Sequence, residues 1–332
     1  MAYSEQVLRR AKARLAQAKE ECEAESAART EEIYTQYPRL REIDRAMRQS
    51  VAKAVAAAFR KGEDPTAAIE AIKQENLALQ QEREWILEAA DLDETALEPT
   101  VVCPRCGGSG YVGASMCECL RELCRQEQKK ELSSLLSGNE HFGQFRLDYY
   151  PTEPDPVLGV SPRQLMQNTY TRCRQYAREF SLKSPSLLFS GGPGLGKTFL
   201  SACIARTVAD NGFSVVYDTA GNVFAQFEAR KFQRDSDDGR EARDETRRYL
   251  NCDLLILDDL GSELTTQFTQ SALYELVNTR LVAGRCTVIS SNLSITEAAQ
   301  RYAPQIASRL EGEYHVLHFF GDDIRLLKKR RL

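Results

Sequence analysis

The chain has 332 residues, a length that suits two or three domains. Hydrophobic residues make up 42% of it and charged residues 28%, so it can build an apolar core and is not disordered overall. Its formal net charge of −4 excludes a general basic field for nucleic acid and leaves only a local patch for such a contact. With no run of about 18 apolar residues and no signal-peptide pattern at residues 1–6, we expect a cytoplasmic protein with no membrane partner.

The first 95 or so residues are rich in Ala, Glu, Arg and Gln, which favour helix. Three successive stripes of side chains recur there every three or four residues. The stripes are Val7, Ala11, Leu15, Ala18 and Cys22; Leu40, Ile43, Met47, Val51, Val55 and Phe59; and Ile69, Ile72, Asn76, Leu79, Arg83 and Ile86. Gly62 ends the second stripe, and Asp64-Pro65 has the pattern of a helix N-cap followed by proline.

We therefore predict two or three long helices that form a helical hairpin or a coiled coil over residues 1–98. Such stripes pack on one another. Because three narrow stripes rarely bury themselves fully, we also expect one of them to dock a helix of a partner protein.

Residues 99–130 change in composition, with Gly, Cys and Pro replacing Ala and Glu. A C-x₂-C pair, Cys103 and Cys106, is followed by a C-x-C pair, Cys117 and Cys119. Four thiolates on two short turns can close a tetrahedral Zn²⁺ site, and a four-cysteine site has a structural role. Cys124 could replace Cys117 or Cys119, and a redox switch is the alternative use of the same thiols.

Residues 140–332 alternate short apolar runs with amphipathic segments. We predict buried parallel strands at 187–190, 214–217, 254–257 and 286–290. Strands that alternate with helices indicate an α/β fold with a parallel sheet and right-handed crossovers.

The first of these strands runs into a phosphate-binding loop of the pattern G-x-x-x-x-G-K-[ST], followed by a predicted helix from Phe199. Glycines let backbone N–H groups point at phosphates, and the helix N-terminus adds partial positive charge. We expect Lys197 to reach the β- and γ-phosphates of ATP and the Thr198 hydroxyl to bind Mg²⁺. The predicted nucleotide contacts are Gly191, Gly192, Pro193, Gly194, Leu195, Gly196, Lys197, Thr198 and Phe199.

The third strand ends in two carboxylates, Asp258 and Asp259. Ligands of open α/β sheets lie at the carboxyl ends of the strands, so Asp258 is placed to hold Mg²⁺ through water. Asp259 is placed to orient or deprotonate the attacking water. Because an Asp side chain is shorter than the Glu found at this place in many related ATPases, slow hydrolysis is expected.

Three motifs together carry a resemblance to a known family. They are the phosphate loop, Leu-Ile-Leu-Asp-Asp-Leu-Gly at 255–261 and Ile-Ser-Ser-Asn-Leu at 289–293. The chain resembles, over about residues 140–330, the AAA+ ATPases of the bacterial replicative helicase loader group (DnaC/DnaI type), which also includes transposition helper ATPases. Modules with similar cysteine spacing precede the ATPase core in many loader-like proteins.

The resemblance implies roles for three further residues. Asn292 looks like the sensor that positions the attacking water. Arg309 looks like an arginine finger, which acts on the γ-phosphate of a neighbouring subunit and so implies a homo-oligomer. Arg325 looks like a second sensor that contacts the nucleotide of its own subunit.

Basic residues gather in two places that could contact single-stranded DNA. They are Arg230, Lys231, Arg234, Arg240, Arg243, Arg247 and Arg248 in one segment, and Lys328, Lys329, Arg330 and Arg331 near the C-terminus. Acidic residues are interleaved with the first group, and a charge run of this kind is usually a solvated surface. We see no aromatic stacking platform among them, and therefore expect no reading of base sequence.

The function that the sequence predicts is an ATP-dependent loader that engages the hexameric replicative helicase through residues 1–130 and delivers it onto single-stranded DNA. A transposition or phage-encoded helper ATPase that binds duplex DNA and a transposase is the alternative. A third possibility is an adaptor that binds ATP but hardly hydrolyses it. A metabolite kinase fits poorly, because the residues at Asn292 and Arg309 match the AAA+ pattern.

Overall fold

A computed structural model describes residues 3, 5–58, 66–135, 140–156, 159–232 and 237–330. The chain divides into two compact units, one made of residues 1–12 and 118–332 and the other of residues 13–117. None of the described helices is long and apolar enough to cross a membrane.

The larger unit is built on a parallel sheet of five strands in the order β4-β5-β6-β3-β7. The strands are β3 (Ser186–Ser190), β4 (Val215–Thr219), β5 (Leu254–Leu260), β6 (Cys286–Ser291) and β7 (Tyr314–His318). Every residue of the central strands β3 and β6 is buried, as expected for a parallel sheet that is covered on both faces. The predicted α/β fold class with a parallel sheet is confirmed.

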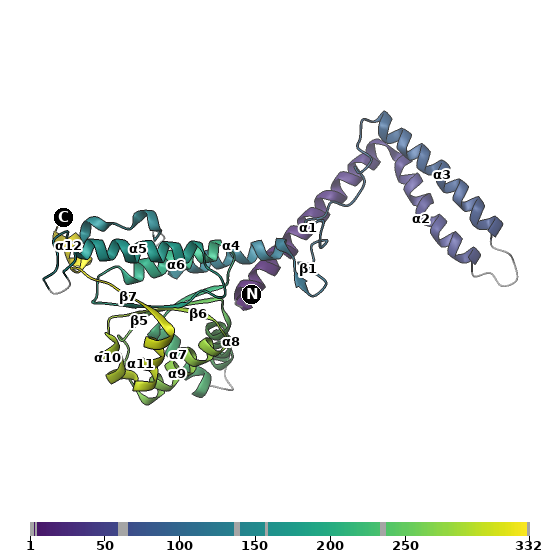
Figure 1. The fold of residues 1–332 in the computed structure, drawn as a ribbon. Helices are drawn as coiled ribbons and strands as arrows, with labels where there is room; N and C mark the ends of the chain where they lie inside the picture. The colour runs from purple at the N-terminus through teal and green to yellow at the C-terminus, as the bar shows by residue number, and fades with distance from the viewer. Residues whose placement is uncertain are drawn as a thin grey trace. The chain divides into compact units, whose positions relative to one another are not determined.

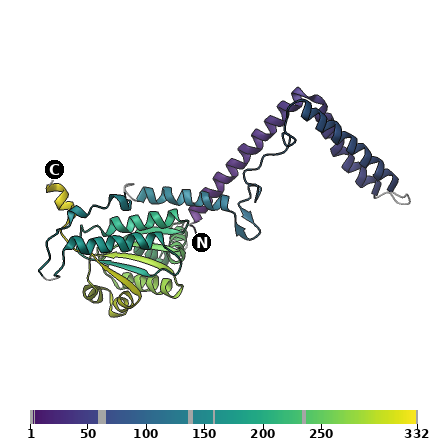
Figure 2. The same ribbon diagram turned by 45° about the horizontal axis from the view of Figure 1, so that its top comes forward.

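Helices cover both faces of this sheet (Figures 1 and 2). One face carries α5 (Pro162–Arg178) and α6 (Lys197–Asp210), whose side chains share a core cluster with β3 and β6. The opposite face carries the second cluster, formed with α7 (Ala220–Phe232), α8 (Asp237–Asn251), α9 (Gln267–Val282), α10 (Ile295–Tyr302) and α11 (Pro304–Glu313). The two clusters fix the sheet, and with it the strand ends that carry the site.

The four strands expected from apolar runs all form, each within a few residues of the predicted bounds. The fifth, β7, was not predicted, because only two of its five residues are buried and its histidines interrupt any apolar run. The last described helix, α12 (Ile324–Arg330), follows β7 and approaches the phosphate loop, where the Ile324 N–H donates to the Gly194 carbonyl.

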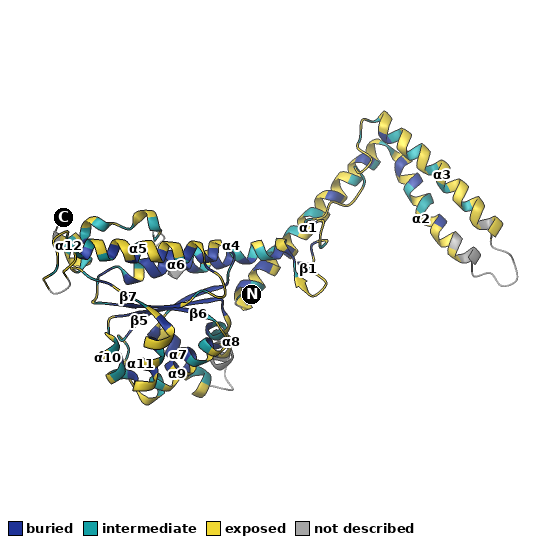
Figure 3. Ribbon diagram, in the orientation of Figure 1, coloured by how far each residue is buried: buried dark blue, intermediate teal, exposed yellow. Residues whose placement is uncertain are grey.

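The smaller unit contains most of α1 (Glu5–Gln36), together with α2 (Pro38–Ala58) and α3 (Thr66–Ala89). Helices α2 and α3 form the expected antiparallel hairpin, joined by ion pairs of Arg39 with Glu82 at 2.7 Å and of Arg83 with Asp44 at 3.3 Å. Most of the hairpin's described surface is exposed, whereas the strands of the larger unit are buried (Figure 3).

The second predicted stripe is partly wrong. Leu40 and Ile43 are fully buried, but Val51 and Val55 are 63% and 53% exposed, and Ser50 is buried instead. The seam, meaning the line of residues that α2 buries, advances by alternating steps of three and four residues, which is the heptad spacing of paired helices. A stripe drawn with repeated steps of four residues moves away from that line. Phe59, Gly62, Asp64 and Pro65, which we expected near the end of the second stripe and the start of the third, lie outside the described residues.

Residues 99–117 form a compact turn region with a two-stranded antiparallel ladder, β1 (Tyr111–Val112) and β2 (Ser115–Met116). Its turn requires Gly113, which has a positive φ of 59°. Helix α4 (Glu118–Leu135) begins directly afterwards and packs on α6 and β4.

Candidate functional site

The phosphate loop lies between β3 and α6, and α6 begins at Lys197 rather than at Phe199 as predicted. The loop's glycines are required by its surroundings as well as by its curvature. Gly194 has φ of 74°, and a Cβ there would lie 2.0 Å from the Asp323 carboxylate. A Cβ on Gly191 would lie 2.4 Å from the Phe319 carbonyl oxygen. A side chain at either position would displace the segment that leads into α12.

The Lys197 ammonium is held by three neutral acceptors. Its Nζ donates to the carbonyl oxygens of Gly191 and Gly192 and to Asn292 Oδ1, each at 2.7 Å. Burial lowers the pKa of Lys197 to about 8, and the nearby Asp259 and Asp258 carboxylates oppose that shift. An anion such as a phosphate would further favour the charged form of Lys197.

Asp258 is a buried carboxylate surrounded by hydroxyl groups. It accepts hydrogen bonds from Thr198 Oγ1 at 3.2 Å, from the Tyr217 hydroxyl at 2.6 Å and from Ser290 Oγ. Mg²⁺ prefers hard oxygen ligands and usually keeps several waters while it binds one or two protein carboxylates and substrate phosphates. The Asp258 carboxylate and the Thr198 hydroxyl fit that preference.

Asp259 has the left-handed backbone conformation, with φ of 57°, which is uncommon for a residue other than glycine. Its N–H donates to Ser290 Oγ at 3.0 Å, and its Oδ1 accepts from Asn292 Nδ2 at 3.0 Å. Asn292 therefore contacts both Lys197 and Asp259. This arrangement turns the second carboxylate out of the strand and towards the cavity.

These groups line one open cavity of about 1280 Å³. Its walls include residues 193–199, the segment 143–146, both carboxylates and Asn292. Arg325 and Lys328 of α12 lie on the same wall. A neighbouring cavity of about 680 Å³ is lined by Gly192, Pro193 and residues 319–323. The larger cavity has room for a nucleotide with its phosphates at the N-terminus of α6.

Arg309 lies on α11 and does not line this cavity. Its guanidinium carbon is 5.4 Å from the centre of the Tyr274 ring, and its Nη2 is 3.5 Å from the Tyr274 hydroxyl oxygen. Within the chain this cavity brings together the predicted residues 193–199, Asp258, Asp259, Asn292 and Arg325, but not Arg309. Of the two remaining predicted contacts, Gly192 lines the neighbouring cavity and Gly191 lines neither. The catalytic and binding roles of these residues remain predictions.

Two residues of the site carried no signal that we used in the sequence. Tyr217 lies in β4, inside an apolar strand where an aromatic residue is ordinary, and its hydroxyl partner is 41 residues away in the chain. Ser290 lies two residues before the predicted sensor Asn292, in a strand whose residues are all buried, so burial does not single it out. The wall formed by residues 143–146 contains no phosphate-binding or catalytic motif.

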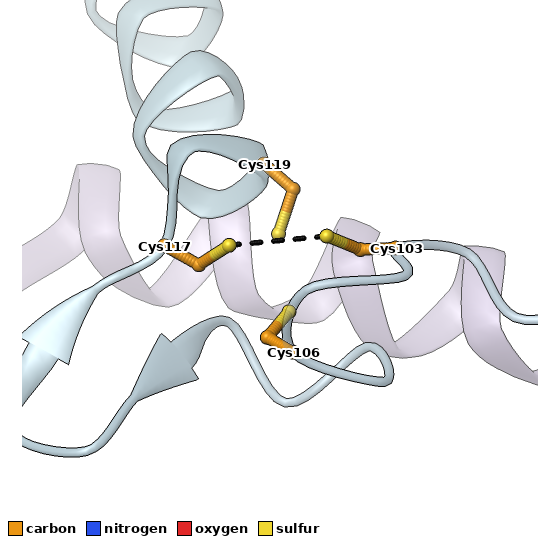
Figure 4. A group of neighbouring side chains, drawn as sticks. All are labelled: Cys103, Cys106, Cys117 and Cys119. Atoms are coloured by element: carbon orange, nitrogen blue, oxygen red, sulfur yellow. Dashed lines mark hydrogen bonds between the residues drawn. The ribbon is translucent and has the colours of Figure 1, made fainter.

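The four cysteines predicted to bind Zn²⁺ point towards one another (Figure 4). Their sulfur atoms all lie within 4.8 Å of each other, and those of Cys103 and Cys117 are 3.8 Å apart. Tetrahedral Zn–S bonds of about 2.3 Å give sulfur–sulfur distances of about 3.8 Å. Cys106 also accepts a hydrogen bond from the Gly110 N–H at 3.4 Å. The set therefore fits a structural zinc ion.

Cys124 is not in this group of thiols. Its side chain is buried in α4, and burial raises its pKa to about 11. The thiols that lie together are therefore those of Cys103, Cys106, Cys117 and Cys119, and their role as zinc ligands stays a prediction.

Part of the chain is similar to known proteins. The family whose profile matches residues 177–332 is described as "IstB-like ATP binding protein". The replicative helicase loader DnaC of Escherichia coli K12 is 24% identical over 143 residues, which cover 43% of this chain and 57% of that protein. The DnaC loader of Buchnera aphidicola subsp. Baizongia pistaciae is 28% identical over 120 residues, covering 36% of this chain and 48% of its own length.

A solved structure of the DnaC helicase loader aligns with a TM-score of 0.44 at 18% identity, over 55% of this chain and 97% of that one. The chain thus spans about half the length of the curated relatives it matches.

Proposed function

We propose that this chain, whose residues 177–332 match the IstB-like ATP-binding family and which is 24% identical to DnaC of Escherichia coli K12 over 143 residues, is an ATP-dependent loader of a replicative DNA helicase. The observation that carries the proposal is the convergence of Lys197, Asp258, Asp259 and Asn292 on one cavity at the N-terminus of α6. The parallel sheet and the first turn of α6 hold these four side chains, so a nucleotide would meet a prepared site.

Each side chain has a distinct task in ATP hydrolysis. Lys197 would leave the loop carbonyls and bind the β- and γ-phosphates, which the backbone of residues 191–196 cradles. Asp258 and the Thr198 hydroxyl would hold Mg²⁺, which neutralises negative charge on the phosphates when it is bound. Asp259 would accept the proton of the attacking water, and Asn292 would orient that water.

A homo-oligomer would complete this site. Arg309 is stacked on Tyr274 away from its own cavity, which supports a role on the γ-phosphate of a neighbouring subunit. Arg325 lines the cavity of its own protomer and would contact the same nucleotide from α12.

The helical hairpin would engage the helicase. Exposed apolar side chains on its two helices include Trp85, which is 68% exposed, and Leu77, which is 43% exposed. The hairpin is held by its own ion pairs and seam, so this apolar surface is not required for its fold. Exposed aromatic residues of this kind are frequent anchors of protein interfaces.

Single-stranded DNA would contact the surface at the end of α7. Phe232 is 66% exposed, and the centre of its ring lies 6.0 Å from that of Phe268, the second residue of α9. The Lys231 ammonium lies 5.3 Å from the Phe268 ring centre. Bases can stack on such rings while the ammonium pairs with a phosphate. Arg230 has a different partner, Glu275 at 2.7 Å.

Phe268 comes from a different helix, so its place beside Phe232 cannot be predicted from sequence spacing alone. Arg234, Arg331 and the side chains of Arg240 and Arg330 lie outside the described part of the chain.

Binding to the purified replicative helicase of the source cell tests the proposal. We expect the full chain to form a complex with the hexamer, and residues 131–332 alone to form none. If the ATPase core bound the helicase as well as the full chain does, engagement through residues 1–130 would be rejected. If neither bound, the loader function itself would be rejected.

A transposition or phage-encoded helper ATPase is the second candidate, since the matching family is IstB-like rather than specific to loaders. Electron microscopy of the chain with duplex DNA and ATP would favour it if DNA-bound filaments formed and no helicase was bound. The third candidate, a nucleotide-gated adaptor, rests on Asp259 and predicts turnover no faster than that of Asp259→Asn, with or without single-stranded DNA.

A further inference from the structure

We propose that Tyr217 is a positioning residue for the Asp258 carboxylate and sets the affinity of the nucleotide site for a divalent cation. The inference rests on the proposed ATP site and adds to it a side chain that none of its motifs contains. Tyr217 would touch neither nucleotide nor metal; it would act through Asp258.

The two side chains come from neighbouring strands. Tyr217 pairs with Ile256 in the register of β4 and β5, two residues before Asp258. Its hydroxyl donates to Asp258 Oδ2 at 2.6 Å. Because an ionised carboxylate can only accept, the phenol is the donor of this bond.

All the donors to Asp258 within the described ranges are hydroxyl groups. The Tyr217 hydroxyl holds Oδ2, while Ser290 and Thr198 hold Oδ1. No arginine or lysine of those ranges forms an ion pair with Asp258, so its charge stays available to a cation. If Thr198 Oγ1 turned towards Mg²⁺, Tyr217 and Ser290 would be the groups left to fix the orientation of the carboxylate.

Fixed orientation matters because Mg²⁺ demands near-ideal octahedral geometry and dehydrates reluctantly. A carboxylate that rotates about its Cβ–Cγ bond loses that geometry for part of the time. Hydrogen-bond partners of metal ligands generally contribute about 10- to 100-fold to metal affinity or activity. Tyr217 is well suited to this task, since the strand backbone and the burial of its ring leave it little freedom.

The next residue of β4 supplies a matched control. Asp218 accepts a hydrogen bond from the Tyr249 hydroxyl, also at 2.6 Å, and Tyr249 is likewise buried. Asp218 does not line the nucleotide cavity. Removing the Tyr249 hydroxyl therefore removes the same kind of bond, at the same strand, from a carboxylate that would hold no metal.

Full-length wild type, Tyr217→Phe and Tyr249→Phe would be compared by titrating Mn²⁺, followed by electron paramagnetic resonance, with a non-hydrolysable ATP analogue present. We expect Tyr217→Phe to raise the dissociation constant for Mn²⁺ by about tenfold or more. Tyr249→Phe should stay within about twofold of wild type. Nucleotide binding measured with a fluorescent analogue in EDTA should be unchanged in both variants, which also shows that both are folded.

An unchanged Mn²⁺ affinity in Tyr217→Phe, or an equal loss in Tyr249→Phe, would overturn the inference, as would a wild-type chain that binds no Mn²⁺ with nucleotide. If Tyr217→Phe failed to fold, Ser290→Ala would be titrated with Mn²⁺ instead. We expect its dissociation constant for Mn²⁺ to rise as well, and an unchanged constant would overturn the inference. A wild type that binds Mn²⁺ and nucleotide normally but no helicase would reject the proposed loader function and leave the role of Tyr217 standing.

Discussion

The nucleotide site and the helical hairpin differ in how far their side chains are held in a packed core. The site collects Asp258 from β5, Asn292 from the residue after β6 and Lys197 from the first residue of α6, so their geometry is set by the packed core. The hairpin buries one narrow seam, and Trp85 projects from it largely exposed. One region thus holds polar side chains around a cavity, whereas the other leaves apolar side chains on its surface.

The substitution Lys197→Ala is expected to have the largest effect, lowering ATP hydrolysis while leaving helicase binding unchanged. Loss of the ammonium removes a charge that would act on the transferred phosphoryl group, and removal of one such donor costs about 10²- to 10³-fold in rate. We expect the turnover number of ATP hydrolysis to fall by that factor, measured by phosphate release. Binding of the same variant to the helicase in the absence of nucleotide should stay near wild type. Equal loss of both would show that the regions do not act separately.

Removal of zinc tests the small cysteine region. Cys103→Ser leaves three thiols of the four, and we expect its zinc affinity to fall by about 100-fold or more, because binding free energy is also folding free energy in such modules. Elemental analysis should find about one zinc ion per wild-type chain. Cys124→Ser is the matched control and should keep its zinc. Loss of zinc from Cys124→Ser, but not from Cys103→Ser, would reverse the ligand assignment.

Trp85→Ala probes the hairpin alone. Truncation of an aromatic anchor at an interface typically costs about 2 kcal/mol or more, equivalent to about 30-fold in affinity. We expect that loss in helicase binding, measured by biolayer interferometry, with unchanged ATP hydrolysis. The neighbouring exposed Gln81→Ala should bind within about twofold of wild type. Full affinity in Trp85→Ala would mean that another face of the hairpin is used.

The smallest effect concerns pH. In the nucleotide-free protein the pKa of Lys197 is lowered to about 8, so its ammonium form is populated below pH 8 and lost above it. ATP would bind that charged form, and its metal-free affinity should fall about tenfold between pH 7 and pH 9 as the charged fraction drops from about nine-tenths to one-tenth. Lys197→Arg keeps its charge throughout and should give a flat profile. A flat wild-type profile would contradict the lowered pKa.

The sequence predicts the ATPase core and the hairpin to different extents. Strand β5 could be predicted from the apolar run Leu254 to Leu257, because a strand buried on both faces needs continuous apolar residues. Strand β7 escaped detection because half of it faces solvent. The phosphate loop could be predicted because its motif is continuous in the sequence. The bond from Tyr217 to Asp258 could not be predicted, because it depends on strand order, which spacing does not encode.

In the hairpin, the sequence predicted the helices but not the seam. Val51 and Ser50 are adjacent, and the choice of which one faces α3 depends on the slow drift between helical and heptad spacing. A stripe drawn from hydrophobicity alone selects the valine. The side chains left outside the seam are therefore the ones most worth testing against a partner.

Delivery of the helicase onto DNA is the measurement that tests the central claim most directly. The replicative helicase of the source cell would be incubated with circular single-stranded DNA coated by a single-strand-binding protein, and release of a labelled annealed strand would be followed. We predict that unwinding starts when the wild-type chain and ATP are both present and is strongly reduced with Lys197→Ala. Unwinding at the same rate with and without the chain would contradict the account.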